Sequence, residues 1–205
     1  MHVTTLPSLR ALYAPTGERS ALKELPALDA HAVHFIKVSP FVVLSSSGAG
    51  GAMDASPRGG APGFVKALDA HTLLIADAPG NNRLDTLQNI IETGQLGLLF
   101  LVPGMDETLR VNGTAVLSTL ESDRTLCEDE RRVPKLVIRV TVQASYLHCA
   151  KALMRSALWD ATRHIDRAAM PSMGEMLRDQ ISDRMGGDMP VETQEQMLER
   201  YRQTL

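Results

Sequence analysis

The sequence predicts a mainly β fold, an antiparallel barrel of five or six strands with helical segments before and after it. Its composition is that of an ordinary globular protein, with 44% apolar and 22% charged residues among 205, so a packed core is expected. The middle of the chain holds apolar, β-branched runs joined by short turns, and both ends show helical spacing and capping residues. We expect one domain over residues 1–205, made of a helical segment 1–39, a barrel 40–150 and a helical tail 151–205.

Three short helices are predicted before the barrel. The first two cover residues 8–13 and 17–25. Asp29 can cap the third helix, whose apolar side carries Val33, Phe35 and Ile36, and Pro40 stops it.

Strands are predicted at 41–44, 65–68, 72–75, 96–102, 108–117 and 136–147. The serines and glycines of 45–51 indicate a flexible turn after the first strand. The continuously apolar run at 96–102 is typical of a strand buried on both faces. One helix interrupts the strands at 82–92, with Asn81 or Asn82 as its cap and Gly94 at its end.

The tail is predicted to be helical and rich in methionine. Ser172 with Glu175, and Thr193 with Gln196, fit two capping boxes, and Gly186, Gly187 and Pro190 separate the two helices. Methionine side chains are flexible and pack well at irregular interfaces, so the tail could cover the chain's own barrel or extend a subunit contact. The methionines concerned are Met170, Met173, Met176, Met185, Met189 and Met197.

Charge and cysteine content exclude several classes of protein. A net charge of −3 argues against broad binding of nucleic acid, and no apolar stretch approaches the ~20 residues of a membrane span. The N-terminus does not resemble a secretory signal. Two cysteines, Cys127 and Cys149, supply neither a disulfide framework nor a zinc site. We expect a cytoplasmic protein without a metal, a nucleic-acid partner or a membrane partner.

Two segments are candidates for holding an anion. Ser56 and Arg58 share one side of an extended segment beside Gly59 and Gly60, which suits a phosphate or a carboxylate. Taken alone, the segment is more often a solvated turn with a surface arginine. Residues 80–83 precede the central helix, where free N–H groups and the helix dipole favour anions; ordinary capping is the alternative.

Later residues give weaker signals. Thr108, Arg110 and Asn112 alternate onto one face of a strand, which suits a planar polar ring or simply solvent. His148 and Cys149 are neighbours on a strand and therefore point to opposite faces, so we do not expect a catalytic cysteine. The histidine spacings match no metal motif, and the motifs of Rossmann sites, P-loops and serine hydrolases are absent from the sequence.

Six motifs follow one another along the chain: FVVL at 41–44, SPRG at 56–59, GFV at 63–65, TLLIAD at 72–77, PGNNRLD at 79–85 and ETLRVNG at 107–113. Taken in order, they resemble the FMN-binding split-barrel proteins related to pyridoxamine 5'-phosphate oxidase. The resemblance is greatest to a bacterial subgroup that carries the SPRG, PGNNR and ETLRVNG motifs. The resemblance covers residues 28–159 and implies a six-stranded antiparallel split β-barrel, with FMN as cofactor in a groove between the subunits of a homodimer.

The resemblance also implies roles for ten residues. Those of the phosphate and ribityl region are Ser56, Arg58, Asp77, Asn81, Asn82 and Arg83. Those of the flavin edge and the pocket wall that a partner subunit completes are Thr108, Arg110, Lys151 and Trp159. The Arg-x-His element with which true pyridoxamine 5'-phosphate oxidases hold their substrate is missing, because Arg163 and His164 are adjacent. Vitamin B6 is therefore not the expected substrate.

The sequence thus predicts an FMN-dependent oxidoreductase acting on a small molecule that we do not identify. A non-enzymatic flavin-binding or sensor protein of the same fold is the alternative, and haem or a deazaflavin could replace FMN because split barrels are reused. No side chain stands out as a general acid or base, so no catalytic residue is assigned.

Overall fold

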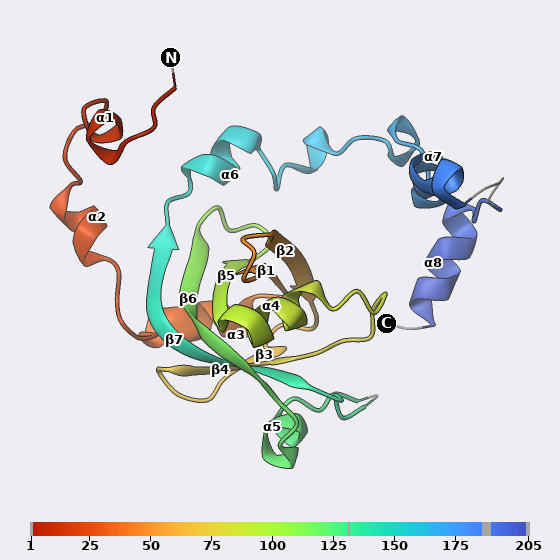
Figure 1. The fold of residues 1–205 in the computed structure, drawn as a ribbon, viewed down its shortest axis with the longest axis horizontal. Helices are drawn as coiled ribbons and strands as arrows, with labels where there is room; N and C mark the ends of the chain where they lie inside the picture. The colour runs from red at the N-terminus through yellow and green to blue at the C-terminus, as the bar shows by residue number, and fades with distance from the viewer. Residues whose placement is uncertain (1, 131, 186–189, 204–205) are drawn as a thin grey trace. The chain divides into compact units, whose positions relative to one another are not determined.

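A computed structural model describes residues 2–130, 132–185 and 190–203 of the protein (Figure 1). The chain forms two compact units, 1–159 and 160–205, which are described separately here.

The first unit is built on one seven-stranded antiparallel sheet in the order β2-β1-β5-β6-β7-β4-β3. Its strands are β1 (Phe41–Ser47), β2 (Met53–Gly59), β3 (Val65–Ala67), β4 (Thr72–Ala76), β5 (Gln95–Leu101), β6 (Thr108–Ser118) and β7 (Val137–His148). The sheet curls into a barrel (Figure 1), and its two edge strands are β2 and β3. The mainly β class and the split-barrel architecture are therefore confirmed, with seven strands instead of six.

The expected turn at 45–51 was wrong in part. β1 continues through Ser47 and pairs along its whole length with β2, from Phe41 opposite Gly59 to Ser47 opposite Met53. Sequence patterns alone do not reveal β2, because it has little apolar character and contains Pro57. An edge strand tolerates a proline, since one side of its backbone needs no partner.

Apolar side chains from alternate strand positions fill the barrel. On β5, Leu96, Leu98 and Phe100 are buried, whereas Leu99 and Leu101 on the other face are only half-buried. The expectation that this strand is buried on both faces is therefore wrong for a single chain. A second, smaller cluster of Leu74, Val137 and Cys127 lies outside the barrel beside β4 and β7. Burial raises the pKa of the Cys127 thiol to about 11, so this cysteine stays protonated.

Helices close the barrel and extend from it. α3 (Ala30–Val38) packs on β3, β6 and β7, and Asp29 caps it as expected, its carboxylate accepting a 2.7 Å hydrogen bond from the Ala32 N–H. α4 (Asp85–Thr93) packs on β1, β2, β5 and β6. The remaining helices of this unit are α1 (Leu6–Arg10), α2 (Glu18–Leu22), α5 (Glu121–Leu126) and α6 (Lys151–Ser156). α5 was not predicted, whereas α6 lies at the start of the predicted helical tail.

The second unit is helical, as expected. Two 3₁₀ turns, Ala161–Arg163 and Arg167–Ala169, precede α7 (Met173–Met185) and α8 (Gln194–Arg202). Both capping boxes form: the Ser172 N–H donates to Glu175 at 2.7 Å, and the Thr193 N–H donates to Gln196 at 2.9 Å. Gly186, Gly187 and Met189 lie outside the described residues.

Candidate functional site

The face of β2 that lies toward the barrel carries polar side chains. Asp54, Ser56 and Arg58 alternate on this face and are half-buried. Ser56 lies opposite Leu44 and Arg58 opposite Val42, so their side chains share the side of the sheet that carries the core. Ser56 and Arg58 therefore lie where the polar edge strand meets the barrel interior.

Asp54 joins this strand to the first turn of α4. Its carboxylate accepts a 2.5 Å hydrogen bond from the Thr86 hydroxyl and one of 2.9 Å from the Ser56 hydroxyl. Thr86 is only 2% exposed. Hydrogen bonds to a carboxylate are stronger than those between neutral groups, so this link fixes β2 against the start of α4.

Arg58 also acts across the split of the barrel. Asp77 follows β4 directly, and its N–H donates to the Leu136 carbonyl at 2.9 Å. Burial raises the pKa of the half-buried Asp77 carboxyl, and the positive charges of Arg58 and Arg132 oppose that rise. A cation from the β2 edge is therefore close enough to influence a carboxylate that follows β4.

The loop before α4 carries the other phosphate candidates. Asn82 and Leu84 have left-handed backbones, with φ of 58° and 61°, which is uncommon for residues other than glycine. α4 begins only at Asp85, with Leu84 at the N-cap position, so the expected cap at Asn81 or Asn82 is wrong. The Asn81 side chain instead accepts a 3.1 Å hydrogen bond from the Arg83 N–H and shapes the loop.

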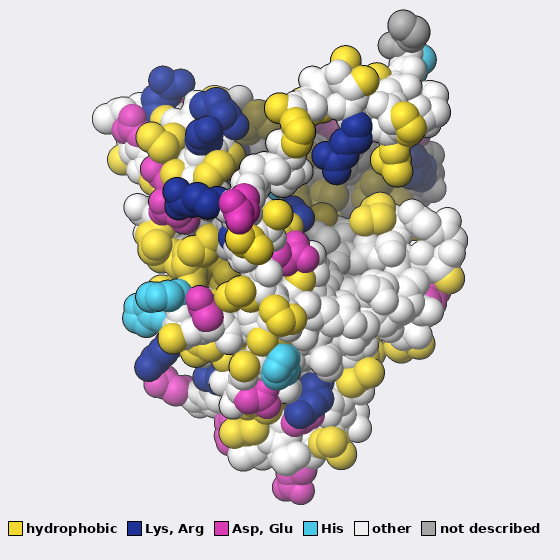
Figure 2. All heavy atoms as spheres, turned by 90° about the vertical axis from the view of Figure 1, so that its left-hand side faces the viewer, with side chains coloured by type: hydrophobic (Ala, Val, Ile, Leu, Met, Phe, Trp, Pro, Cys, Tyr) yellow, Lys and Arg dark blue, Asp and Glu magenta, His cyan; other side chains and the backbone are white. Residues whose placement is uncertain are grey.

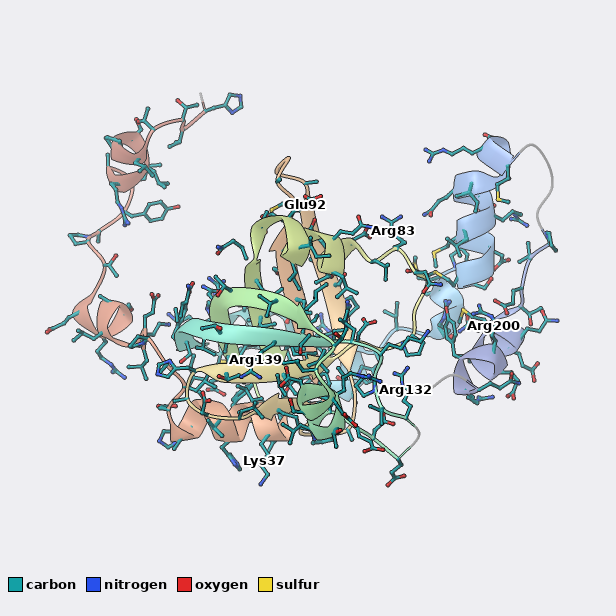
Figure 3. The ribbon with its side chains drawn as sticks, turned by 60° about the horizontal axis from the view of Figure 1, so that its bottom comes forward. Lys37, Arg83, Glu92, Arg132, Arg139 and Arg200 are labelled. Atoms are coloured by element: carbon teal, nitrogen blue, oxygen red, sulfur yellow. The ribbon has the colours of Figure 1, made fainter. Side chains whose placement is uncertain are left out.

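Arg83 is the most accessible cation of this group. Its side chain is 72% exposed and extends away from the barrel (Figure 3). Nε donates to Asp85 at 2.8 Å, and this hydrogen bond raises the pKa of Arg83 above its usual value. An exposed ion pair of this kind contributes little to stability, so the guanidinium can exchange partners readily.

Thr108 and Arg110 lie on the other face of the sheet. Their neighbours Leu109 and Val111 point into the core, so Thr108 and Arg110 point outward. Arg110 donates to the Tyr146 hydroxyl at 2.9 Å. Within one chain, the phosphate candidates and the flavin-edge candidates therefore lie on opposite faces of the sheet.

Among the described residues, no hydrogen bond or ion pair connects Lys151 or Trp159 to either group. Lys151 is exposed at the start of α6. The indole N–H of the half-buried Trp159 donates to the Met105 carbonyl at 2.8 Å, which anchors the end of the first unit. In the part of the chain that the structure describes, no group of three potential ligands could hold a metal ion.

Cys149 is exposed directly after β7, and we expect it to be dispensable. Replacing Cys149 with serine should leave the visible spectrum of bound flavin and any flavin-reduction activity unchanged, because the neighbouring His148 is expected to point to the opposite face and the sequence spacing indicates no group that would orient it. Absorption spectra and turnover of the two proteins test this. Complete loss of turnover with FMN still bound would overturn it.

Sequence reasoning missed several residues that shape these groups. Asp54 could have been found, because it continues the two-residue alternation of Ser56 and Arg58. Thr86 and Lys23 could not, because their partners lie 32 and 124 residues away in the chain.

The geometry defines the class of the protein: a split barrel whose edge strand, with Ser56 and Arg58, is linked through Asp54 to the start of α4. A family model described as pyridoxamine 5'-phosphate oxidase matches residues 28–149. The chain belongs to this family, as the resemblance predicted; the bacterial subgroup stays a prediction.

Several solved structures are similar to this chain at low sequence identity. A HupZ variant from Group A Streptococcus is 18% identical with a TM-score of 0.50, over 58% of this chain and 98% of that one. A candidate pyridoxamine 5'-phosphate oxidase of Lactobacillus delbrueckii is 19% identical (TM-score 0.48, 61% and 99% covered). An FMN-binding protein from Syntrophomonas wolfei is 12% identical (TM-score 0.42, 57% and 81% covered). A comparison with curated protein sequences gives no match. Among the described residues, no helix is both long and apolar enough to cross a membrane.

Proposed function

We propose that the protein binds FMN between two copies of the chain and acts as an FMN-dependent oxidoreductase on a small molecule. The observation that carries the proposal is the link through Asp54, which holds the strand of Ser56 and Arg58 against the helix start that follows Arg83. Family membership supports the same assignment. We further propose that it works in the cytoplasm, in keeping with its two free cysteines.

The donors present fit a phosphate monoester. Arg58 and Arg83 supply two guanidinium groups, Asn81 and Asn82 supply amides, and the N-terminus of α4 supplies a favourable dipole. The Asp54 carboxylate is held by hydrogen bonds from Ser56 and Thr86, and its negative charge is one that Arg58 and Arg83 have to outweigh. The protein as a whole carries a net charge of −3, so a bound dianion needs a local excess of hydrogen-bond donors such as this one.

FMN, when bound, supplies one- or two-electron transfer, and the residues of this chain bind and orient it. Arg58 and Arg83 would hold the phosphate, and Asp77, whose carboxyl is influenced by the charge of Arg58, would lie along the ribityl chain. Thr108 and Arg110, on the outer face, would reach the flavin ring held by the other copy. Arg163 and His164 are adjacent and exposed, which supports the view that vitamin B6 is not the substrate.

The absorption spectrum of the purified protein after incubation with FMN and removal of excess tests cofactor binding. Oxidised-flavin bands that remain with the protein are expected. Reduction by NADH or NADPH followed by reoxidation separates an enzyme from a non-enzymatic flavin-binding or sensor protein. A protein that retains no flavin would contradict the proposal.

Dissociation of the dimer is expected to release FMN. Each chain carries its two groups of candidate residues on opposite faces of the sheet, so a complete site needs a second copy. Leu99 and Leu101 leave apolar surface on the outer face of β5, which a partner can cover. An obligate interface should bury more than about 2,000 Å² in total.

Light scattering during serial dilution, recorded with flavin fluorescence, measures both events. The fluorescence of released FMN should rise as the mass falls from dimer to monomer. A monomer that keeps FMN at undiminished affinity would refute the interface and the shared site together.

A further inference from the structure

Four side chains on the outer face of β6 and β7 form a cluster, the outer basic cluster: Lys23, Arg110, Tyr146 and His148. The Tyr146 ring is its centre, with the Lys23 ammonium 5.2 Å and the Arg110 guanidinium carbon 5.5 Å from the ring centroid. The His148 ring lies beside it, at 5.2 Å between centroids. Hydrophobic side chains lie exposed among basic ones on the side of the molecule that Figure 2 shows.

Backbone contacts hold Lys23 in this cluster, although it precedes β7 by more than 100 residues. The N–H of Leu25 donates to the Ser145 carbonyl at 3.0 Å, and the N–H of Ser145 donates back at 2.8 Å. The Lys23 ammonium itself donates to the Leu147 carbonyl at 2.8 Å. The ammonium is therefore positioned before any ligand arrives, which lowers the ordering cost of binding.

The positive charge of this cluster is not neutralised within the chain. Neither Lys23 nor Arg110 forms an ion pair with a carboxylate of the described residues; the partners that they do have are the Leu147 carbonyl and the Tyr146 hydroxyl. Two cations over one aromatic ring repel each other, and an anion between them would remove that repulsion.

His148 gives a second, independent indication. Its Nε2 atom is buried yet has no hydrogen-bond partner within the described part of the chain. Buried polar atoms are nearly always satisfied, so one that is not calls for a missing partner. Burial, with the charges of Arg110 and Lys23, lowers the pKa of His148, and the imidazole is therefore neutral at pH 7. Thr108, opposite His148 on β6, adds no charge.

We propose that the outer basic cluster is a binding site for the carboxylate or phosphate group of a small acidic ligand. The planar fork of Arg110 and the ammonium of Lys23 hold the oxyanion, and the Tyr146 ring packs against the body of the ligand. An anion held by Lys23 and Arg110 offsets the positive charges that disfavour protonation of His148, so the imidazole becomes easier to protonate when the anion binds. The inference deepens the proposed function: Arg110, which pairs with Leu99 on the face that a second copy would cover, would hold the anion of the ligand beside the flavin ring of that copy. The binding test below can fail without any loss of FMN binding.

The test follows His148 directly by NMR of the full-length protein with ¹³C-labelled histidine, whose signal is identified among the six histidines by His148→Gln. Sodium acetate and sodium phosphate are titrated separately at constant ionic strength, without FMN and again with FMN. We expect a saturable shift with millimolar affinity and a higher pKa of His148 in the bound state, so that binding strengthens as the pH falls. The better probe identifies the ligand group as carboxylate or phosphate.

Variants separate this site from other anion sites. Lys23→Met and Arg110→Met should each weaken the probe roughly tenfold or more, the scale of a charged hydrogen bond. Lys37→Met, which removes an exposed lysine of α3, should not change the affinity. Arg58→Ala should also leave the His148 response intact, so failure of the flavin site and failure of this site are distinguishable. The proposal would be overturned if the His148 signal shifted with neither probe. It would also be overturned if Lys23→Met and Arg110→Met both bound the probe as tightly as the unaltered protein.

Discussion

Replacing Arg58 or Arg83 with alanine is expected to weaken FMN binding by about 1.5–3 kcal/mol each, roughly ten- to 150-fold, the value of a hydrogen bond to a charged group. Arg58 is half-buried on β2, where the loss of one donor is poorly compensated by water. Arg83 is exposed, so its effect should fall at the lower end of this range and weaken further with added salt.

Flavin fluorescence during titration of the apoprotein measures both affinities. Arg19→Ala is the matched control, because it removes an exposed arginine from α2, far in sequence from the proposed phosphate donors. Its affinity for FMN should equal that of the unaltered protein. If neither Arg58→Ala nor Arg83→Ala changes the affinity, the phosphate assignment is wrong.

The second large effect is expected at Gly113, where the pairing of β6 with β7 shifts at a bulge between Asn112 and Gly113. A side chain there would overlap the backbone carbonyl of Thr141, and the ladder prevents that carbonyl from moving away. Gly113→Ala should therefore destabilise the fold by about 3 kcal/mol, at the upper end of overpacking effects.

Urea unfolding followed by circular dichroism measures this change. Gly50→Ala serves as the control, because a Cβ at Gly50 meets no atom within 4 Å. That variant should unfold within a few tenths of a kcal/mol of the unaltered protein, as surface substitutions usually do. Equal midpoints for both variants would mean that the β6–β7 bulge adapts to a side chain.

Local signals were sufficient where one segment determines its own structure. Asp29, Ser172 and Thr193 cap helices as their sequence context predicts, because a cap depends on three or four neighbouring residues. β2 was not visible in this way, since its pairing with β1 and not its composition makes it a strand. The left-handed Leu84 likewise moved the start of α4 beyond the asparagines that looked like its caps.

For the candidate site too, local spacing predicted some placements and long-range contacts decided the others. Spacing along β2 placed Ser56 and Arg58 on one side of the strand, and the structure agrees. Spacing could not show that Thr108 and Arg110 face away from them, because that depends on how the sheet closes. Nor could it bring Lys23 to Tyr146, since a contact between residues so far apart in the sequence leaves no periodic pattern.

The two hydrogen bonds between Leu25 and Ser145 have a consequence for the solubility of the chain. β7 pairs with β4 only as far as Thr141, so without further cover its last residues would present a bare strand edge. Bare edges invite pairing with other chains and lead to aggregation. The segment before α3 caps this edge at Ser145, and Lys23 adds a charge there. A chain shortened to begin at Leu28 would keep its core residues but lose this protection, and it should aggregate at concentrations that the full chain tolerates.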